Sequence, residues 1–368
     1  MIKYSVDEID RNRLLELLMY RYPISGNSLI SGAKLDSFFT FEETNKLVNS
    51  ANTIKSLSPD FKILDKLFTK LILSYPRKLS LPVSGGIDST YLVLKCLELG
   101  KKIELLNLSF GNYSERKKAL TLSEEIGEKL VEIDVSGSLL IKEFPKICKE
   151  MITPNERGST LMSWFIYKKA KYDVLTAEFM DGVLSPSGGH DKNPKKMFGK
   201  DFTNLTSSKY NARLDFVPHE NHNIMMMLFD AFHELPYYYR IRYNTFAKSR
   251  VFAPCQDMDI ISTSLKMPEI HKKNKLNIEK FELKNFASEL CKKLSISPYI
   301  CWEPKGIFKI EPYDFSELGE YYLDKSIIKS FGINAKFLDK GKWENDKNKA
   351  WSNLLLTIFS MWFKKHIR

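Results

Sequence analysis

The sequence predicts an α/β protein, with a parallel sheet flanked by helices and a mostly helical C-terminal half. Three observations support this. Short apolar runs alternate with helix-period stretches between residues 79 and 177, which is typical of parallel strands joined by crossover helices. A glycine pair lies at the junction of the first run and the helix after it. Helical periodicity dominates from about residue 210 and ends in an apolar stripe from Trp351 to Trp362.

Residues 1–75 form a predicted helical lead-in segment, interrupted by the Pro/Gly/Ser-containing stretch 22–32. Apolar residues recur at helical spacing between Leu64 and Ile72, just before Pro76. We therefore expect residues 76–368 to form the main domain, with its helical part beginning at about residue 210. In that domain the predicted strands are residues 79–83, 103–108, 130–135 and 174–177, and the predicted helices are residues 91–97, 114–129 and 161–170. Ser114 is the expected N-cap of the second helix.

The composition fits an ordinary globular protein. Of 368 residues, 43% are hydrophobic and 27% charged, which excludes a disordered chain. No apolar run approaches the roughly 18 residues that cross a bilayer, and the charged N-terminus is not a secretory signal. We therefore expect a cytoplasmic protein without a membrane partner.

The net charge of +11 is the one unusual bulk property (56 Lys+Arg − 45 Asp+Glu). Basic and acidic residues are mixed along the chain, and we interpret the local excess at residues 192–200 as a solvated loop. Nucleic acid is therefore not an expected partner.

The five cysteines are odd in number and contain no CxxC pair, which argues against a disulfide framework and a zinc ribbon. We expect Cys96 to pack in the core, and His219 and His222 to be polar surface residues.

The strongest motif is Ser84-Gly85-Gly86-Ile87-Asp88-Ser89, between a predicted strand and a predicted helix. Two glycines let the backbone approach an anion, and a helix N-terminus supplies free N–H groups. Asp88 beside phosphates would repel them unless a cation such as Mg²⁺ intervenes. A glycine turn capped by Ser and Asp is the alternative. The full hexapeptide in its strand–loop–helix context favours pyrophosphate binding.

This motif is neither a Walker A loop nor a dinucleotide fingerprint, and it resembles the PP-loop of the N-type ATP pyrophosphatases. Other segments narrow the resemblance to the synthetase domain of asparagine synthetases and relatives such as β-lactam synthetases. Residues 176–182 resemble that family's TGEGADE stretch, keeping Thr176, Glu178 and Asp181. Weaker similarities lie at residues 20–35, Gly188-Gly189, residues 250–257, residues 304–308 and the final Trp-rich helix.

The resemblance implies a role for each matching residue. ATP would be held by Val83, Ser84, Gly85, Gly86, Asp88, Ser89, Ser109 (or its neighbour Leu108), Thr176 and Ala177. Asp88 and Asp181 would share Mg²⁺ and pyrophosphate. Glu178 would serve in the proton transfer that frees an attacking amine, and Lys305 would stabilise charge developing on the α-phosphate.

Two departures from the family pattern limit the resemblance. Phe179 and Met180 replace small residues and Gly182 replaces an acid, which puts the acceptor pocket in doubt and argues against asparagine synthesis from aspartate. The roughly 75 residues before the PP-loop unit are too few for the family's N-terminal glutaminase domain. We therefore expect free ammonia, ammonia from a separate glutaminase, or a different amine.

The resemblance implies an ATP- and Mg²⁺-dependent carbon–nitrogen ligase. It would adenylate a small-molecule or peptide carboxylate, release pyrophosphate and let the amine attack, giving an amide and AMP. Two alternatives stay open: a PP-loop enzyme that modifies RNA or nucleotides, and a degenerate nucleotide-binding protein. The sequence names neither substrate, and it does not fix the oligomeric state.

Overall fold

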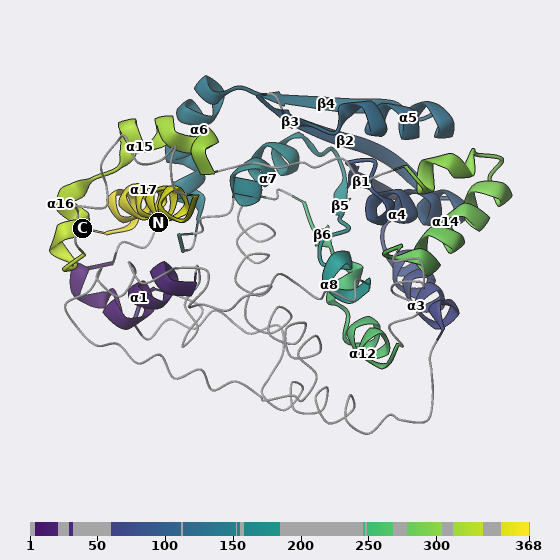
Figure 1. Cartoon of the computed structure of the whole chain (residues 1–368), viewed down its shortest axis with the longest axis horizontal. Helices are drawn as coiled ribbons and strands as arrows, with labels where there is room; N and C mark the ends of the chain where they lie inside the picture. The colour runs from purple at the N-terminus through teal and green to yellow at the C-terminus, as the bar shows by residue number, and fades with distance from the viewer. Residues whose placement is uncertain are drawn as a thin grey trace.

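A computed structural model describes most of the chain (Figure 1). The described residues are 4–20, 29–31, 60–111, 113–151, 153–154, 158–184, 246, 249–267, 278–303, 312–333 and 347–367. None of the helices in these ranges is both long enough and apolar enough to cross a membrane.

The centre of the fold is a sheet whose main strands all run in parallel. Its order is β4–β2–β1–β5–β6, and the short β3 pairs with β2 in the antiparallel direction. The strands are β1 (Lys78–Pro82), β2 (Lys102–Phe110), β3 (Tyr113–Ser114), β4 (Leu130–Val135), β5 (Asp173–Leu175) and β6 (Val251–Phe252). In the register, Lys78 is opposite Lys102, and Leu79 is opposite Asp173. The carboxyl ends of β1, β2 and β5 therefore lie at one edge of the sheet.

Helices cover both faces of this sheet, which confirms the predicted α/β class. The helices described before β6 are α1 (Arg11–Tyr20), α3 (Phe61–Ser74), α4 (Ile87–Glu98), α5 (Arg116–Ile126), α6 (Gly137–Glu150), α7 (Gly158–Lys169) and α8 (Met180–Leu184). Those after it are α12 (Met258–Lys266), α14 (Phe281–Lys293), α15 (Ser316–Tyr322), α16 (Lys325–Ser330) and α17 (Lys347–His366). Short 3₁₀ turns cover Val6–Glu8, Pro254–Gln256, Pro298–Cys301 and Pro312–Phe315.

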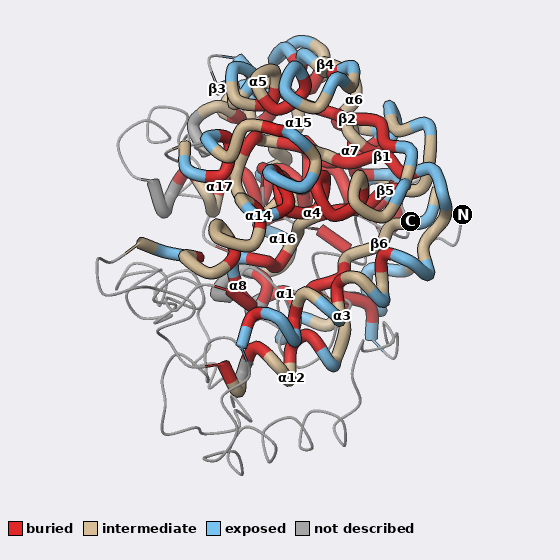
Figure 2. Tube along the Cα trace, turned by 90° about the vertical axis from the view of Figure 1, so that its right-hand side faces the viewer, coloured by how far each residue is buried: buried red, intermediate tan, exposed pale blue. Residues whose placement is uncertain are grey.

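Two apolar cores, one on each face of the sheet, follow from the alternation of strand side chains. Leu79, Leu81 and Leu105 point into the core formed with α3, α4, α5, α12 and α14. Leu108 and Phe110 point into the other core, formed with α6, α7, α15 and α17. Figure 2 shows β1, β2 and α4 as largely buried. The strand that precedes the glycine motif and the helix that follows it are therefore both fixed by packing.

The two described helices of the N-terminal segment pack in different cores. Leu14 and Leu17 of α1 belong to the core that contains α17, and Figure 1 shows these helices side by side near both termini. The backbone N–H of Tyr4 donates to the carbonyl of His366 at 2.9 Å. Phe61 and Phe68 of α3 instead contact the ring of Tyr91 on α4. The two described helices of the N-terminal segment thus contribute to the cores on opposite faces of the sheet.

Several sequence predictions need correction or extension. Ser114 does not cap α5, because it pairs with Ser109 as part of β3, and the N-cap residue is Glu115. The helix α6 was not predicted, since Pro145 interrupts its pattern, and β6 was missed because it is only two residues long. Cys96 is fully buried as expected, and all five cysteines are free. The interpretations of residues 192–200, His219, His222 and Gly188-Gly189 concern positions outside the described residues.

Candidate active site

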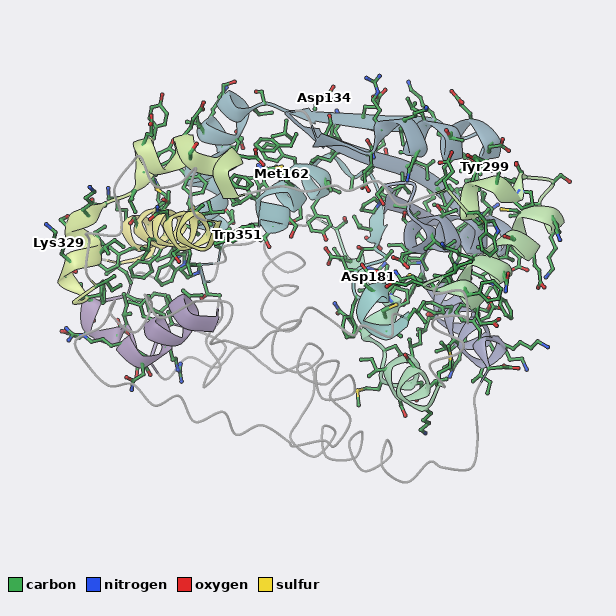
Figure 3. All side chains as sticks on the ribbon, in the orientation of Figure 1. Asp134, Met162, Asp181, Tyr299, Lys329 and Trp351 are labelled. Atoms are coloured by element: carbon green, nitrogen blue, oxygen red, sulfur yellow. The ribbon has the colours of Figure 1, made fainter. Side chains whose placement is uncertain are left out.

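A pocket of about 430 Å³ opens at the carboxyl ends of β1, β2 and β5. Ligands of open α/β sheets bind at this edge. Most of its lining comes from the glycine motif, the end of β2, α7, the turn after β5 and the residues around the start of α14. The lining residues are Pro82, Val83, Ser84, Gly86, Ile87, Asp88, Ser89, Leu106, Asn107, Leu108, Glu115, Ser159, Met162, Ser163, Ile166, Tyr167, Thr176, Ala177, Glu178, Asp181, Glu279, Lys280, Lys284 and Glu303. Figure 3 labels two of them, Met162 on α7 and Asp181 on α8.

The glycine motif forms a tight loop between β1 and α4. Gly85 has a φ of +70°, and a Cβ there would lie 2.3 Å from Cβ of Lys118 and 2.8 Å from its backbone carbon. Glycine is therefore required at this position both by conformation and by space. The N–H of Gly86 donates to Oγ of Ser84 at 3.2 Å, and Oγ of Ser89 donates to the carbonyl of Gly86 at 3.1 Å. The loop is thus shaped before any ligand binds.

A second loop of the pocket follows β5. The N–H of Thr176 donates to the carbonyl of Phe252 at 2.9 Å, so β6 holds this turn in place. The N–H of Glu178 donates to Oγ1 of Thr176 at 3.3 Å, and α8 then begins at Met180. The turn directs Thr176, Ala177, Glu178 and Asp181 to the pocket, although it departs from the family pattern at the positions between them.

Phe179 and Gly182, two of the residues that depart from the family pattern, lie next to each other in the structure. Phe179 has a φ of +71°, a left-handed conformation that favours the glycine of the family's pattern. Its ring is buried beside Gly182, where an added Cβ would lie 2.2 Å from the ring. The ring therefore occupies space that a side chain at position 182 would need. Neither residue lines the pocket. These two departures from the family pattern therefore alter how the turn packs, and the residues that line the pocket stay in place.

The most distinctive contact in the pocket joins Asp88 and Asp181 through one lysine. Nζ of Lys280 donates to Oδ2 of Asp88 at 2.5 Å and to Oδ1 of Asp181. The Lys280 side chain is 7% exposed, that of Asp88 16% and that of Asp181 66%. Burial opposes the charge on Lys280, but the two carboxylates outweigh it and raise the pKa of the ammonium above its usual value.

The two aspartates fit the Mg²⁺ that the family resemblance implies. They come from different loops, yet both carboxylates lie within hydrogen-bond reach of a single cation, the Lys280 ammonium. In the described part of the chain, no group of three or more His, Cys, Asp or Glu residues could hold a metal by itself.

Three of the residues expected from the sequence are not among those that the structure places in the pocket lining. Gly85 belongs to the loop but is not a lining residue. Ser109 is not among the lining residues, and its Oγ donates to Oδ1 of Asp134, whereas its neighbour Leu108 lines the pocket. Lys305 lies outside the described residues, and Glu303, two positions before it, lines the pocket.

Sequence reasoning missed part of the pocket. The side chain of Asn107 donates to the carbonyl of Val83 at 2.7 Å and so joins the end of β2 to the start of the loop. One wall consists of α7, whose Met162 and Ile166 give it an apolar surface. Lys280 was missed because nothing in the sequence distinguishes it among 56 lysines and arginines. The α7 wall could have been expected, since a helix leading into β5 must lie against the sheet.

Comparison with protein families supports the interpretation of these loops. Residues 75–233 match the family model described as asparagine synthase. This segment is an asparagine synthase domain. The match includes the glycine loop, Glu178 and Asp181, whereas Lys280 lies beyond it. No glutaminase model matches the chain, and no curated protein matches it. The domain supports ATP-dependent amidation or ligase chemistry in general, with ATP as the family's substrate, generally together with Mg²⁺.

Proposed function

We propose that this protein is an ATP-dependent ligase that forms an amide from a carboxylate and an amine, with AMP and pyrophosphate as the other products. One observation carries the proposal. The glycine loop, the acid Glu178 and the paired aspartates Asp88 and Asp181 all line one pocket, at the edge where α/β sheets bind ligands.

The loop and the α4 N-terminus would hold the phosphates. Backbone N–H groups at the start of a helix attract anions, and residues 83–89 present Ser84 and Ser89 as additional hydrogen-bonding groups. Leu108, Met162 and Ile166 form an apolar surface that suits a purine ring. Thr176 and Ala177, at the end of β5, would contact the nucleotide between these two parts.

Asp88 and Asp181 would hold Mg²⁺ against the phosphates. When bound, Mg²⁺ neutralises part of the phosphate charge and stabilises the leaving pyrophosphate. The protein would contribute two carboxylates from two separately fixed loops, one at the start of α4 and one at the start of α8.

The chemistry would proceed in two balanced steps. A carboxylate oxygen of the substrate attacks the α-phosphorus, and the bond to the β-phosphate oxygen breaks with its electron pair leaving on pyrophosphate. The amine nitrogen then attacks the acyl carbon, the bond to AMP breaks, and Glu178 accepts the proton that the nitrogen loses. We propose that Lys305 stabilises the negative charge that develops during these steps.

The decisive experiment makes two measurements with a panel of carboxylates. The first is exchange of labelled pyrophosphate into ATP, and the second is product formation with hydroxylamine as the trapping amine. We expect exchange, a hydroxamate and equal amounts of AMP and pyrophosphate with the correct carboxylate. Asp88→Ala should reduce the rate by at least about 100-fold, because the cation that neutralises the phosphates loses one of its two protein carboxylates. Asp259→Ala, an exposed acid on α12 outside the pocket, is the matched control and should be unaffected. Release of ADP and phosphate would contradict the proposal, as would ATP binding with no turnover across the panel.

A further inference from the structure

The Lys280 ammonium lies at the position that the proposed metal would need. It donates to Oδ2 of Asp88 and Oδ1 of Asp181, and these carboxylates are the two proposed metal ligands. A divalent cation held by the same two carboxylates would lie close to the ammonium, and the two positive charges would repel each other. Lys280 therefore opposes metal binding while its ammonium holds this position.

The backbone fixes where this lysine enters the pocket. Lys280 has a left-handed conformation, with a φ of 55°, and immediately precedes α14. Its carbonyl accepts a hydrogen bond from the N–H of Lys284 at 3.0 Å. The helix α14 is held against neighbouring helices, for example by Phe286, whose ring centroid lies 4.8 Å from that of Phe61. The Lys280 Cα is therefore set by packing, and the long side chain is the part that can move.

The charges explain why the lysine occupies the site in the ligand-free protein. Two carboxylates facing one another would repel, and the ammonium between them removes most of that repulsion. The ammonium is itself almost buried, so it must stay close to an anion wherever it moves. Asp181 is the more exposed partner, and the ion pair can open on that side.

We propose that Lys280 is an internal counter-ion that closes the metal site of the ligand-free protein, so that Mg²⁺ enters together with the triphosphate. The displaced ammonium then binds the oxygens of the β- and γ-phosphates, which arrive in the same pocket. This inference rests on the proposed function, in that Asp88 and Asp181 are taken as the metal ligands. In this proposal Lys280 controls when the metal enters its site, and it becomes a ligand of pyrophosphate.

The test measures two affinities in the absence of turnover. Mn²⁺ binding to the ligand-free protein is followed by electron paramagnetic resonance, and binding of inorganic pyrophosphate with Mg²⁺ is followed by calorimetry. Lys280→Met keeps the length of the side chain and removes its charge. We expect it to bind Mn²⁺ at least about tenfold more tightly than the wild type, and pyrophosphate at least about tenfold more weakly.

Controls separate this role from a purely structural one. Lys292→Met removes an exposed charge from the same helix and should match the wild type in both affinities. Lys280→Arg keeps the positive charge and should keep Mn²⁺ binding weak. Lys280→Gln supplies a second neutral variant if the methionine variant does not fold.

Opposite changes in the two affinities support the proposal. Unchanged or weaker Mn²⁺ binding in folded neutral variants would overturn the counter-ion role. Tighter Mn²⁺ binding with unchanged pyrophosphate binding would overturn the transfer of the ammonium to the phosphates. Because neither measurement needs a carboxylate or an amine, failure to find ligase products would count against the proposed function and leave this test intact.

Discussion

Two walls of the same pocket are built in opposite ways. The loop wall, residues 83–89, is a continuous segment between β1 and α4, and its shape comes from backbone conformation and short hydrogen bonds. The lysine wall is formed by Lys280, which immediately precedes α14, and its ammonium contacts Asp88, a residue 192 positions earlier in the sequence. The loop wall depends on the absence of side-chain atoms at Gly85, whereas the lysine wall depends on one charged side chain.

This difference predicts that the two walls fail for different reasons. Added volume should damage the loop wall, because its backbone already lies against Lys118 of α5. Altered charge should damage the lysine wall, because its function lies in the ammonium. Steric substitutions and charge substitutions therefore separate the contributions of the two walls.

The largest expected effect is that of Gly85→Ala in the loop wall. The added Cβ would meet Lys118 at 2.3 Å in a backbone conformation that alanine disfavours. We expect a loss of about 3 kcal/mol in the free energy of unfolding and at least about 100-fold weaker ATP binding. Urea denaturation and calorimetric titration with ATP measure the two quantities.

Gly100→Ala is the matched control for that substitution. Gly100 has a similar φ of +66°, but nothing lies within 4 Å of its added Cβ. We expect only the conformational cost, about 1 kcal/mol, and unchanged ATP binding. If both alanine variants behaved alike, the close approach to Lys118 would have no role in shaping the loop.

A smaller effect is expected at the turn after β5, which carries Glu178 and leads to Asp181, the partner of Lys280. Gly182→Ala would place a Cβ 2.2 Å from the Phe179 ring and should cost about 2 kcal/mol of stability. In a Phe179→Ala background the ring is gone, and the same substitution should cost almost nothing. A double-mutant cycle by urea denaturation measures this coupling, expected at about 2 kcal/mol. Additive effects would show that the Phe179 ring does not restrict the side chain at position 182.

The smallest expected effect is at the contact between α4 and α14. Glu98 of α4 accepts hydrogen bonds from Lys95 at 2.7 Å and from Lys293 of α14 at 3.3 Å. Burial alone would raise the pKa of Glu98, but these lysines outweigh it and lower the pKa. Glu98→Gln should cost about 1 kcal/mol at pH 7.

The pH dependence of that variant has a defined sign. Because the folded pKa is lowered, the stabilisation by Glu98 is complete above its unfolded pKa of about 4.3, and it is lost as the pH falls through the folded value. The difference in urea stability between the wild type and Glu98→Gln should therefore narrow on acidification below about pH 4. A difference that stays constant down to about pH 2.5 would mean that the charge of Glu98 contributes nothing.

Local patterns predicted most of the sheet. The strands at 79–83, 103–108 and 130–135 correspond to β1, β2 and β4, because their apolar residues are buried on one or both faces. The glycine motif was recognisable because its six residues are consecutive and adopt their conformation through contacts with one another. β6 escaped prediction because its two residues belong to the sheet only through pairing with β5.

The sequence by itself determined the α/β class, the position of the glycine loop between β1 and α4, and the acids that follow β5. These features depend on contacts between residues close in the chain or on the periodicity of apolar side chains. Only the tertiary structure decided that the Phe179 ring fills the space beside Gly182 and that Lys280 joins Asp88 to Asp181. The physical reason is that an ion pair between distant segments depends on how packed helices place them, and a lysine in a lysine-rich chain carries no local sign of that placement.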